Sequence, residues 1–294
     1  MNRSVPMHGI IAYPITPFAA DGSVDIPKYK ELLQRLLSAD VHGIAPLGSA
    51  GVLPYLSDEE RESVAAATLE QVGRSVPVMI GVSSLTTERA VHHAKFAEKL
   101  GASAVMVIPM SYWKLTEAEI LKHYDTIAEA ISIPIMAYNN PATGGLDMPP
   151  EFLAKLLRIP NVTMIKESTG DIHRLHRLVQ VAGEDVAFYN GSNPLALDAL
   201  IAGARGWCTA APNLIPQLNL DLLSAVAAGN LARAVDVFRK QLPVLQFIVQ
   251  GGLPRTVAAG LRLLGIEPGP QRAPLAELSP ADVDRLKLIL DSLV

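Results

Sequence analysis

Short apolar runs alternate along the chain with longer segments in which apolar residues recur every three or four positions. Most of these runs are continuous rather than alternating in polarity, which is typical of strands that are covered on both faces. The runs fall at residues 9–16, 43–48, 77–82, 104–109, 134–139, 162–168, 187–191 and 206–211. The pattern therefore predicts eight buried, parallel strands that are joined by helices.

The segments between the runs carry the signals of amphipathic helices. In residues 27–38, apolar side chains share one face of the predicted helix and charged side chains take the other. Ser57, Thr86 and Thr116 stand where an N-cap is expected, because a hydroxyl there accepts a hydrogen bond from the first turn. Gly101 follows such a segment, at the position where a helix ends in a left-handed residue.

Eight strand–helix units within about 225 residues are close to the roughly 250 residues of a (β/α)₈ TIM barrel of the α/β class. A doubly wound open sheet is the alternative, but it uses fewer strands, and no G-x-G-x-x-G follows the first one. Beyond the eighth run the pattern is helical only, at residues 220–228, 231–248, 254–264 and 280–293. We expect a barrel over residues 1–225 and a helical extension over 226–294 that packs on it.

The composition of the 294 residues excludes several classes of protein. A hydrophobic share of 49% excludes an intrinsically disordered chain. The 25 Lys+Arg against 29 Asp+Glu give a net charge of −4, so no basic surplus points to nucleic acid or to an anionic membrane. Cys208 is the single cysteine, which excludes an intrachain disulfide and a cysteine-rich zinc site and fits the cytoplasm.

No targeting or membrane-spanning segment is predicted. Pro6, Pro14 and Pro17 interrupt the N-terminal apolar stretch before it reaches the length of a signal-peptide core. No apolar run approaches the roughly 18 residues of a membrane span.

Two residues at predicted strand ends carry candidate chemistry, because the active site of such a barrel lies at the carboxyl ends of its strands. Lys166 lies within the buried sixth run, where desolvation should lower the pKa of its amine and leave a nucleophile toward carbonyls. A structural lysine that pairs with Glu167 is the alternative. Tyr138 ends the fifth run, where it could exchange protons with a substrate on the lysine or simply pack at the rim.

The remaining candidates are weaker. The turn from Gly48 to Gly51 contains small residues whose backbone N–H groups can approach an anion, although a short glycine turn is common after a strand. His92 and His93, and likewise His173 and His176, share predicted helices but lack a set of carboxylates. We expect these histidines to be solvated and predict no metal site.

Several short motifs lie one after another along the chain, each at the end of a predicted strand. They are Pro14–Phe18, Gly48–Gly51 followed by Leu56–Glu59, Tyr138–Pro141, Ile165–Ser168, Gly191 and Gly206. On these motifs the chain resembles the dihydrodipicolinate synthase / N-acetylneuraminate lyase family along nearly its whole length. The resemblance implies a TIM barrel, a lyase of the class I aldolase type, and typically a homotetramer built as a dimer of dimers.

The resemblance also implies a mechanism without metal or organic cofactor. Lys166 would form a Schiff base with pyruvate or a longer 2-oxo acid, Tyr138 would shuttle protons, and Ser49 would hold the tyrosine hydroxyl. Pyruvate and an aldehyde would be the partners. The implied substrate-binding residues are Gly48, Ala50, Gly51, Thr143, Gly191, Ser192, Asn193 and Cys208.

Three departures from the family pattern bear on the substrate. Ala50 replaces a hydroxyl residue that would hold the carboxylate of pyruvate. Ser111 stands where relatives supply a tyrosine to the proton relay, and Tyr112 next to it is a possible substitute. Thr143 stands where the dihydrodipicolinate synthases have an arginine, whose loss removes about 2–5 kcal/mol of carboxylate recognition.

The sequence therefore favours an aldolase or lyase that joins pyruvate to an aldehyde and acts on a hydroxylated 2-oxo sugar acid. Three alternatives stay open at this point: 4-hydroxy-tetrahydrodipicolinate synthesis, dehydration or deamination of a 2-oxo-3-deoxy acid through the same lysine imine, and a non-catalytic protein that binds 2-oxo acids. A phosphate-binding barrel is disfavoured, since only Arg205 accompanies the last loops.

Overall fold

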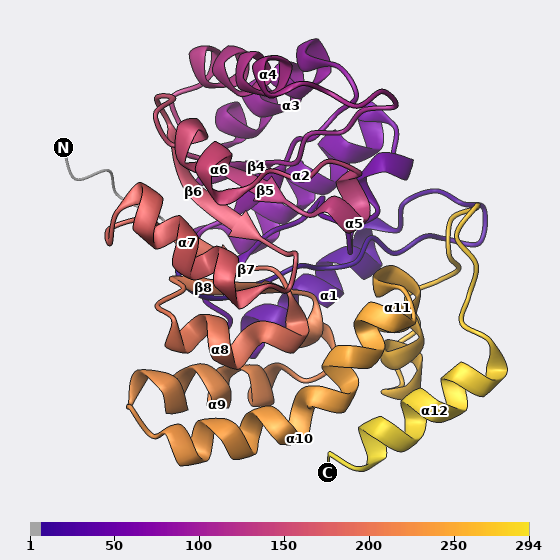
Figure 1. The fold of residues 1–294 in the computed structure, drawn as a ribbon. Coiled ribbons are helices and arrows are strands. Elements are labelled where there is room, and N and C mark those ends of the chain that lie inside the picture. The colour runs from indigo at the N-terminus through magenta and orange to yellow at the C-terminus, as the bar shows by residue number, and fades with distance from the viewer. Residues whose placement is uncertain (1–6, 294) are drawn as a thin grey trace.

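A closed parallel barrel forms the centre of the molecule, in a computed structural model that describes residues 7–293 (Figure 1). The strands are β1 (Gly9–Ala12), β2 (Gly43–Ile44), β3 (Met79–Gly81), β4 (Ala104–Val107), β5 (Ile135–Asn139), β6 (Val162–Glu167), β7 (Phe188–Asn190) and β8 (Gly206–Thr209). They neighbour one another in the order β2-β1-β8-β7-β6-β5-β4-β3. A single parallel bridge between Ile44 and Val78 joins the two ends of this series. The predicted (β/α)₈ barrel is confirmed.

Helices surround the barrel and cover the outer faces of its strands. They are α1 (Ile26–Ser38), α2 (Asp58–Val72), α3 (Thr87–Leu100), α4 (Glu117–Ala130), α5 (Pro141–Gly144), α6 (Pro150–Leu156), α7 (Ile172–Ala182), α8 (Ala196–Ile201) and α9 (Pro216–Ala227). Short 3₁₀ turns η1 (Leu53–Tyr55), η2 (Asn193–Leu195) and η3 (Ala211–Asn213) follow β2, β7 and β8. With helices outside and side chains packed inside, the strands are buried on both faces, which explains their continuous apolar runs.

The predicted helix caps are present. The side chains of Ser57 and Thr116 accept hydrogen bonds from the N3 backbone of α2 and α4, and each completes a capping box with a glutamate. Thr86 caps α3, which ends at Gly101 with a left-handed φ of 89°. The cap hydrogen bonds determine the first residue of each of these helices. They therefore also determine the last residue of the loop that joins the preceding strand to the helix.

Three helices follow the barrel: α10 (Leu231–Gln250), α11 (Leu253–Leu263) and α12 (Pro280–Asp291). Figure 1 shows them, in orange and yellow, packed together on one side of the barrel. The helix α9, which follows the last strand, begins four residues earlier than the expected helix at 220–228, because Ile215 and Pro216 already start the turn. The segment before α12 returns toward the barrel, where Arg272 contacts Glu60 at 2.6 Å.

None of the helices in residues 7–293 combines the length and the hydropathy that crossing a bilayer requires. The predicted absence of a signal core concerns a segment that includes Pro6, which lies outside the described residues.

Two buried histidines are expected to make the stability of the fold depend on pH. Burial lowers the pKa of His123 and of His93 below the usual 6.5, and only His93 has a carboxylate, Asp58, that offsets part of the effect. Near and below pH 6.5 the unfolded chain therefore binds more protons than the folded one. The contribution of these histidines to the free energy of unfolding is at its full value above pH 6.5 and decreases as the pH falls below it. Each such histidine can contribute up to about 1.4 kcal/mol per pH unit.

The measurement is the midpoint of thermal unfolding at a series of pH values from about 7.5 to about 5.5, which spans the ordinary histidine pKa. His123→Gln should reduce the fall in the midpoint, because glutamine can keep the bond to Thr87 that His123 Nδ1 makes at 2.8 Å. His176→Gln, on the exposed face of α7, serves as the control. Equal slopes in wild type and His123→Gln would contradict this account.

Candidate active site

Lys166 lies inside the barrel, on β6, and its Cα pairs in register with that of Tyr138 on β5. The lysine side chain is 5% exposed. Its Nζ lies 3.9 Å from the centroid of the Tyr138 ring and 4.0 Å from that of Tyr13, which follows β1. An ammonium held between two aromatic faces is attracted by both rings. The sequence analysis did not identify Tyr13, and no motif marked it.

The neighbouring Glu167 does not pair with Lys166. The alternative prediction, a structural lysine that pairs with Glu167, is therefore wrong. Successive residues of a strand point to opposite faces, and Glu167 therefore faces the outer helices. Its carboxylate accepts hydrogen bonds from Asn139 Nδ2 at 3.0 Å and from Arg174 Nε at 3.3 Å. Within residues 7–293, no carboxylate lies within ion-pair distance of Lys166. The amine has aromatic neighbours in place of a counter-ion.

The two tyrosines beside the lysine differ in acidity. Burial by itself raises the pKa of Tyr138, but the Lys166 ammonium and polar contacts from Asn140, Ser49 and Ser168 outweigh it and lower the pKa. The Tyr138 hydroxyl accepts a hydrogen bond from Asn140 Nδ2 at 2.8 Å. Burial raises the pKa of Tyr13 well above its usual value. Tyr138 is therefore the phenol that can lose and regain a proton beside the amine.

The Gly48–Gly51 turn packs against the segment that follows β1. A Cβ on Gly48 would lie 2.6 Å from the Tyr13 ring, so only glycine allows this approach. The Thr16 hydroxyl donates to the carbonyl of Gly51 at 2.8 Å and fixes the other end of the turn. Ala50 is buried and Ser49 half-buried. The turn is thus held against Tyr13, and its residues Gly48 and Ser49 line the same cavity as Tyr138.

Cys208 is buried on β8, close to the amine. Burial raises the pKa of its thiol, and the neighbouring Lys166 and Tyr13 offset part of that rise. Ser192 and Asn193, which follow β7, are occupied with local hydrogen bonds: Asn193 Oδ1 accepts from the Thr209 hydroxyl at 2.7 Å, and the Ser192 N–H donates to Asn190. Neither Ser192 nor Asn193 is among the residues that line the main cavity.

Gly191 lies against the lysine. A Cβ at this position would lie 1.8 Å from Ser168 Oγ and 2.7 Å from Lys166 Cε. The Ser168 hydroxyl is buried and makes no hydrogen bond of ordinary geometry, but it lies close enough to Tyr138 to help lower the pKa of that phenol. The sequence analysis named Gly191 from the resemblance but did not single out Ser168 as a site residue.

We expect Gly191→Ala to reduce kcat/KM by at least about 100-fold, since displacement of a reacting group by about 1 Å has that effect. The added methyl group must push aside Ser168 or the lysine side chain. A double variant, Gly191→Ala with Ser168→Gly, should recover part of the activity because it removes the closest obstacle. Steady-state kinetics and thermal unfolding measure the two effects separately. A loss below fivefold in the single variant would contradict the expected displacement.

The cavity beside Tyr138 has a volume of about 360 Å³, within the range of small-molecule sites. Gly48, Ser49, Tyr138 and Thr143 of the predicted set line it. Lys166 is not among the lining residues, but its Nζ lies 3.9 Å from the centroid of the Tyr138 ring. Most of the other lining residues are apolar, and some come from the C-terminal extension, which the sequence analysis did not connect to the site.

The two candidates for the third member of a proton relay are not brought into this cavity. Tyr112 is 90% exposed and stacks edge-on against Trp113, with ring centroids 5.5 Å apart. Ser111 is half-buried but does not line the cavity, although Met110 next to it does. Within one chain, therefore, the phenol of Tyr138 has no tyrosine partner from this segment.

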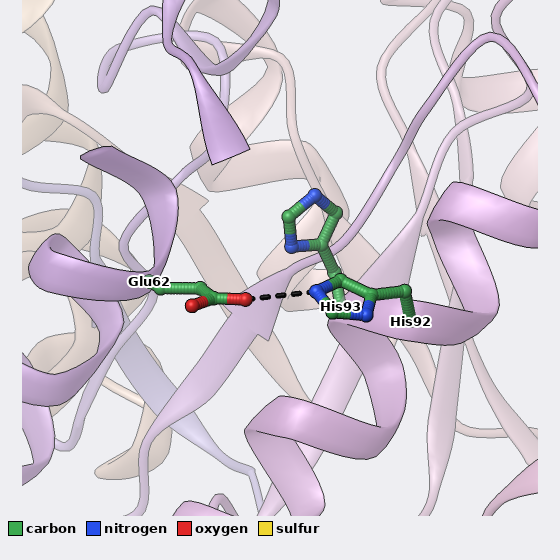
Figure 2. Close-up of side chains that lie close together, drawn as sticks. All are labelled: Glu62, His92 and His93. Carbon is green, nitrogen blue, oxygen red and sulfur yellow. Dashed lines mark hydrogen bonds and ion pairs between the residues drawn. The ribbon is translucent and has the colours of Figure 1, made fainter. Parts of the chain in front are cut away.

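A group of possible metal ligands lies on the outer helices. Figure 2 shows Glu62 of α2 facing His92 and His93 of α3, and their ligand atoms lie within 4.8 Å of one another. His92 Nε2 already bonds Glu62 at 2.8 Å, and His93 Nε2 bonds Asp58 at 2.9 Å. We interpret the group as a hydrogen-bonded contact between α2 and α3. The expectation that both histidines are solvated is wrong for His93, which is 5% exposed.

A parallel (β/α)₈ barrel with a buried amine beside a phenol, on neighbouring strands, is the arrangement expected of a barrel lyase. The Dihydrodipicolinate synthetase family model matches residues 6–293, and the chain belongs to that family. It is 34% identical over 285 residues to the 4-hydroxy-tetrahydrodipicolinate synthase of Methanoculleus marisnigri, covering 96% of this chain and 98% of the relative.

Solved structures agree with this assignment. A Pseudomonas aeruginosa protein, whose assignment as a dihydrodipicolinate synthetase is provisional, is 52% identical with a TM-score of 0.96, covering 98% of this chain and 100% of the other. YagE, a prophage protein of the same family from Escherichia coli K12 solved with pyruvate, is 28% identical with a TM-score of 0.92, covering 98% and 99%. The predicted family and the predicted enzyme class, a lyase, are confirmed.

Proposed function

We propose that this enzyme joins pyruvate to an aldehyde, or cleaves the corresponding product, through a Schiff base on Lys166. The observation that carries the proposal is the buried amine without a counter-ion, which lies 3.9 Å from the ring of Tyr138. A buried lysine of this kind is suited to attack a ketone. The complex of YagE with pyruvate supports the choice of 2-oxo acid.

The reaction is balanced by water and by protons that Tyr138 carries. The amine of Lys166 adds to C2 of pyruvate, and loss of water leaves an iminium. Removal of a C3 proton gives an enamine, whose C3 forms a bond to the aldehyde carbon while the aldehyde oxygen takes up a proton. Water then hydrolyses the iminium and frees the lysine. No metal or organic cofactor takes part in these steps.

The surrounding residues receive roles that agree with their positions. We propose that the backbone N–H groups of Ser49 and Ala50 bind the carboxylate of pyruvate, with Gly48 and Gly51 allowing its close approach. Ser49 holds the phenol of Tyr138, and the nearby Ser168 helps to lower its pKa. Gly191 and Cys208 leave room for the lysine, and Thr143, which lines the cavity, contacts the second substrate. A contact of Ser192 or Asn193 with that substrate stays a prediction, since neither residue lines the cavity.

The test is reduction of the imine. Incubation of the full chain with pyruvate and borohydride should add one reduced pyruvyl unit per chain, located on Lys166 by peptide mass spectrometry. Incubation with pyruvate but without borohydride is the control. A wild-type protein that gains no mass under these conditions would refute the proposed function.

A second candidate is 4-hydroxy-tetrahydrodipicolinate synthesis, which the name of the Methanoculleus marisnigri relative favours. The exposed Thr143 supplies no positive charge for an aldehyde that bears a carboxylate. Product analysis separates the remaining alternatives: pyruvate with a free aldehyde indicates cleavage, and an intact carbon skeleton indicates dehydration or deamination. Pyruvate binding without turnover would indicate a non-catalytic protein.

We further propose that the chain forms a homotetramer, arranged as a dimer of dimers. Tyr112 and Trp113 are 90% and 78% exposed, and aromatic pairs of this kind are enriched in protein interfaces. One family relative of 30% identity was characterised as a monomeric variant, so assembly varies among these proteins. We propose a cytoplasmic location, which a single buried thiol fits.

Replacement of both aromatic residues, in Tyr112→Ser with Trp113→Ser, should weaken self-association by at least about tenfold, the effect of losing one interface anchor. Analytical ultracentrifugation over a range of concentrations measures the change. Leu288→Ser, at a 71% exposed position of α12, is the matched control. An unchanged sedimentation profile would place the interface elsewhere.

A further inference from the structure

We propose that the second substrate is an aldehyde with an uncharged, apolar body, either branched aliphatic or aromatic. The inference rests on the proposed function and specifies its substrate class. It is drawn from the outer part of the cavity beside Tyr138, where the group attached to the aldehyde carbon must lie if C3 of the enamine is to reach that carbon.

The outer wall of the cavity is built from hydrocarbon. Val52 and Leu53 come from the segment after β2, Ile108 and Met110 from the segment after β4, and Leu253 and Leu275 from the C-terminal extension. None of the residues that line the cavity carries a charge. Gly144 of α5 and Leu253 of α11, two helices that Figure 1 labels, line this same cavity. An apolar group transferred here from water is stabilised in proportion to the area it buries.

Two arginines that contact the backbone of lining residues, Arg61 and Arg272, are occupied elsewhere. Arg61 donates to the carbonyl of Ser83 at 3.2 Å, outside the cavity lining. Arg272 forms two bonds of 2.6 Å to Glu60. A carboxylate that entered the outer cavity would therefore lose its water without gaining a partner, which is strongly unfavourable.

A substrate with several hydroxyl groups would find few partners. Ser83 Oγ already accepts from the backbone N–H of Ile108 at 2.8 Å, and the Thr143 hydroxyl is directed at the carbonyl of Asn140, 3.4 Å away. Of the other polar side chains in the lining, Ser49 and Tyr138 belong with the lysine, and Tyr55, which is 42% exposed, offers a single hydroxyl. The lining therefore favours a different second substrate from the hydroxylated sugar acid that the sequence suggested.

The experiment compares four aldehydes with the full chain and pyruvate. 3-Methylbutanal and benzaldehyde are the apolar probes, and glyceraldehyde and succinic semialdehyde are the hydroxylated and carboxylated ones. Aldol product is measured by mass spectrometry. We expect kcat/KM for each apolar aldehyde to exceed that for either polar one by at least about 100-fold, the discrimination that a small number of buried contacts provides.

A charge placed in the wall should reverse this preference. Leu253→Arg is expected to lower kcat/KM for benzaldehyde at least tenfold and to raise it for succinic semialdehyde, with Leu275→Arg as a second variant if the first does not fold. Leu264→Arg, at a 43% exposed position at the end of the same helix, should keep the wild-type ratios. All variants should form the pyruvate adduct.

The outcomes separate the two proposals. If the adduct forms on Lys166 but the polar aldehydes react as well as the apolar ones, this inference is overturned and the proposed function stands. If no adduct forms, both are refuted. A wild-type preference for apolar aldehydes that Leu253→Arg abolishes and Leu264→Arg retains would support the inference.

Discussion

Lys166→Ala is expected to abolish the pyruvate adduct and to lower kcat by at least about 10⁴-fold, because no other group can supply the covalent intermediate. The amine lies between the rings of Tyr13 and Tyr138, 4.0 and 3.9 Å from their centroids. Lys166→Arg tests the chemistry more sharply. It keeps a cation between the two rings, so the fold should survive, but a guanidinium does not form the imine.

Lys155→Ala is the matched control, since this lysine is 48% exposed on its side chain and pairs with Glu117 on the surface. Mass spectrometry after borohydride reduction should find the adduct in this variant and in wild type, and in neither Lys166 variant. Thermal unfolding verifies that each protein is folded. Should Lys166→Ala still trap pyruvate on another lysine, the assignment of the nucleophile is wrong.

Tyr138→Phe should lower kcat by about 10²–10⁴-fold, the usual contribution of a positioned proton donor and acceptor. Imine formation should continue at a reduced rate, because the lysine remains in place. In wild type, the pKa of Tyr138 is lowered from the ordinary tyrosine value of 10.0. We therefore expect kcat to fall on the basic side of the pH profile at a pH below that value. The variant should not show this fall.

Tyr13→Phe provides the contrast. The ring next to Lys166 is retained, and only the bond from the Tyr13 hydroxyl to Met106 Sδ, 3.1 Å long, is removed. Because burial keeps Tyr13 protonated, we expect this variant to retain at least about one tenth of the activity with an unchanged pH profile. Equal losses in the two variants would show that Tyr138 has no special part in moving protons.

The strands, the caps and the placement of Lys166 and Tyr138 could be predicted because each depends on local sequence. A continuous apolar run specifies a buried strand, and a barrel brings the ends of its strands together. Ser57 and Thr116 act within their own helices. The pairing of Lys166 with Tyr138 follows from adjacency of β5 and β6.

What was missed depends on contacts between distant segments. Tyr13 reaches Lys166 only because the curved sheet brings together the inner faces of β1 and β6, which β8 and β7 separate. His93 is buried because α3 packs on α2, where Asp58 receives it. Glu167 pairs with Arg174 on the following helix. Because side chains alternate between the two faces of β6, Glu167 points away from Lys166, which the alternative of a pair between these two neighbours did not consider.

The cavity wall formed by Leu253, Pro254 and Leu275 has an evolutionary consequence. These residues follow the last barrel strand, whereas the proposed nucleophile and its phenol belong to β5 and β6. Mutations in the C-terminal segments can therefore change which molecules are accepted while the bond-forming groups stay as they are. Proteins that descend from one ancestral gene could therefore acquire different substrates through changes in the C-terminal segments alone.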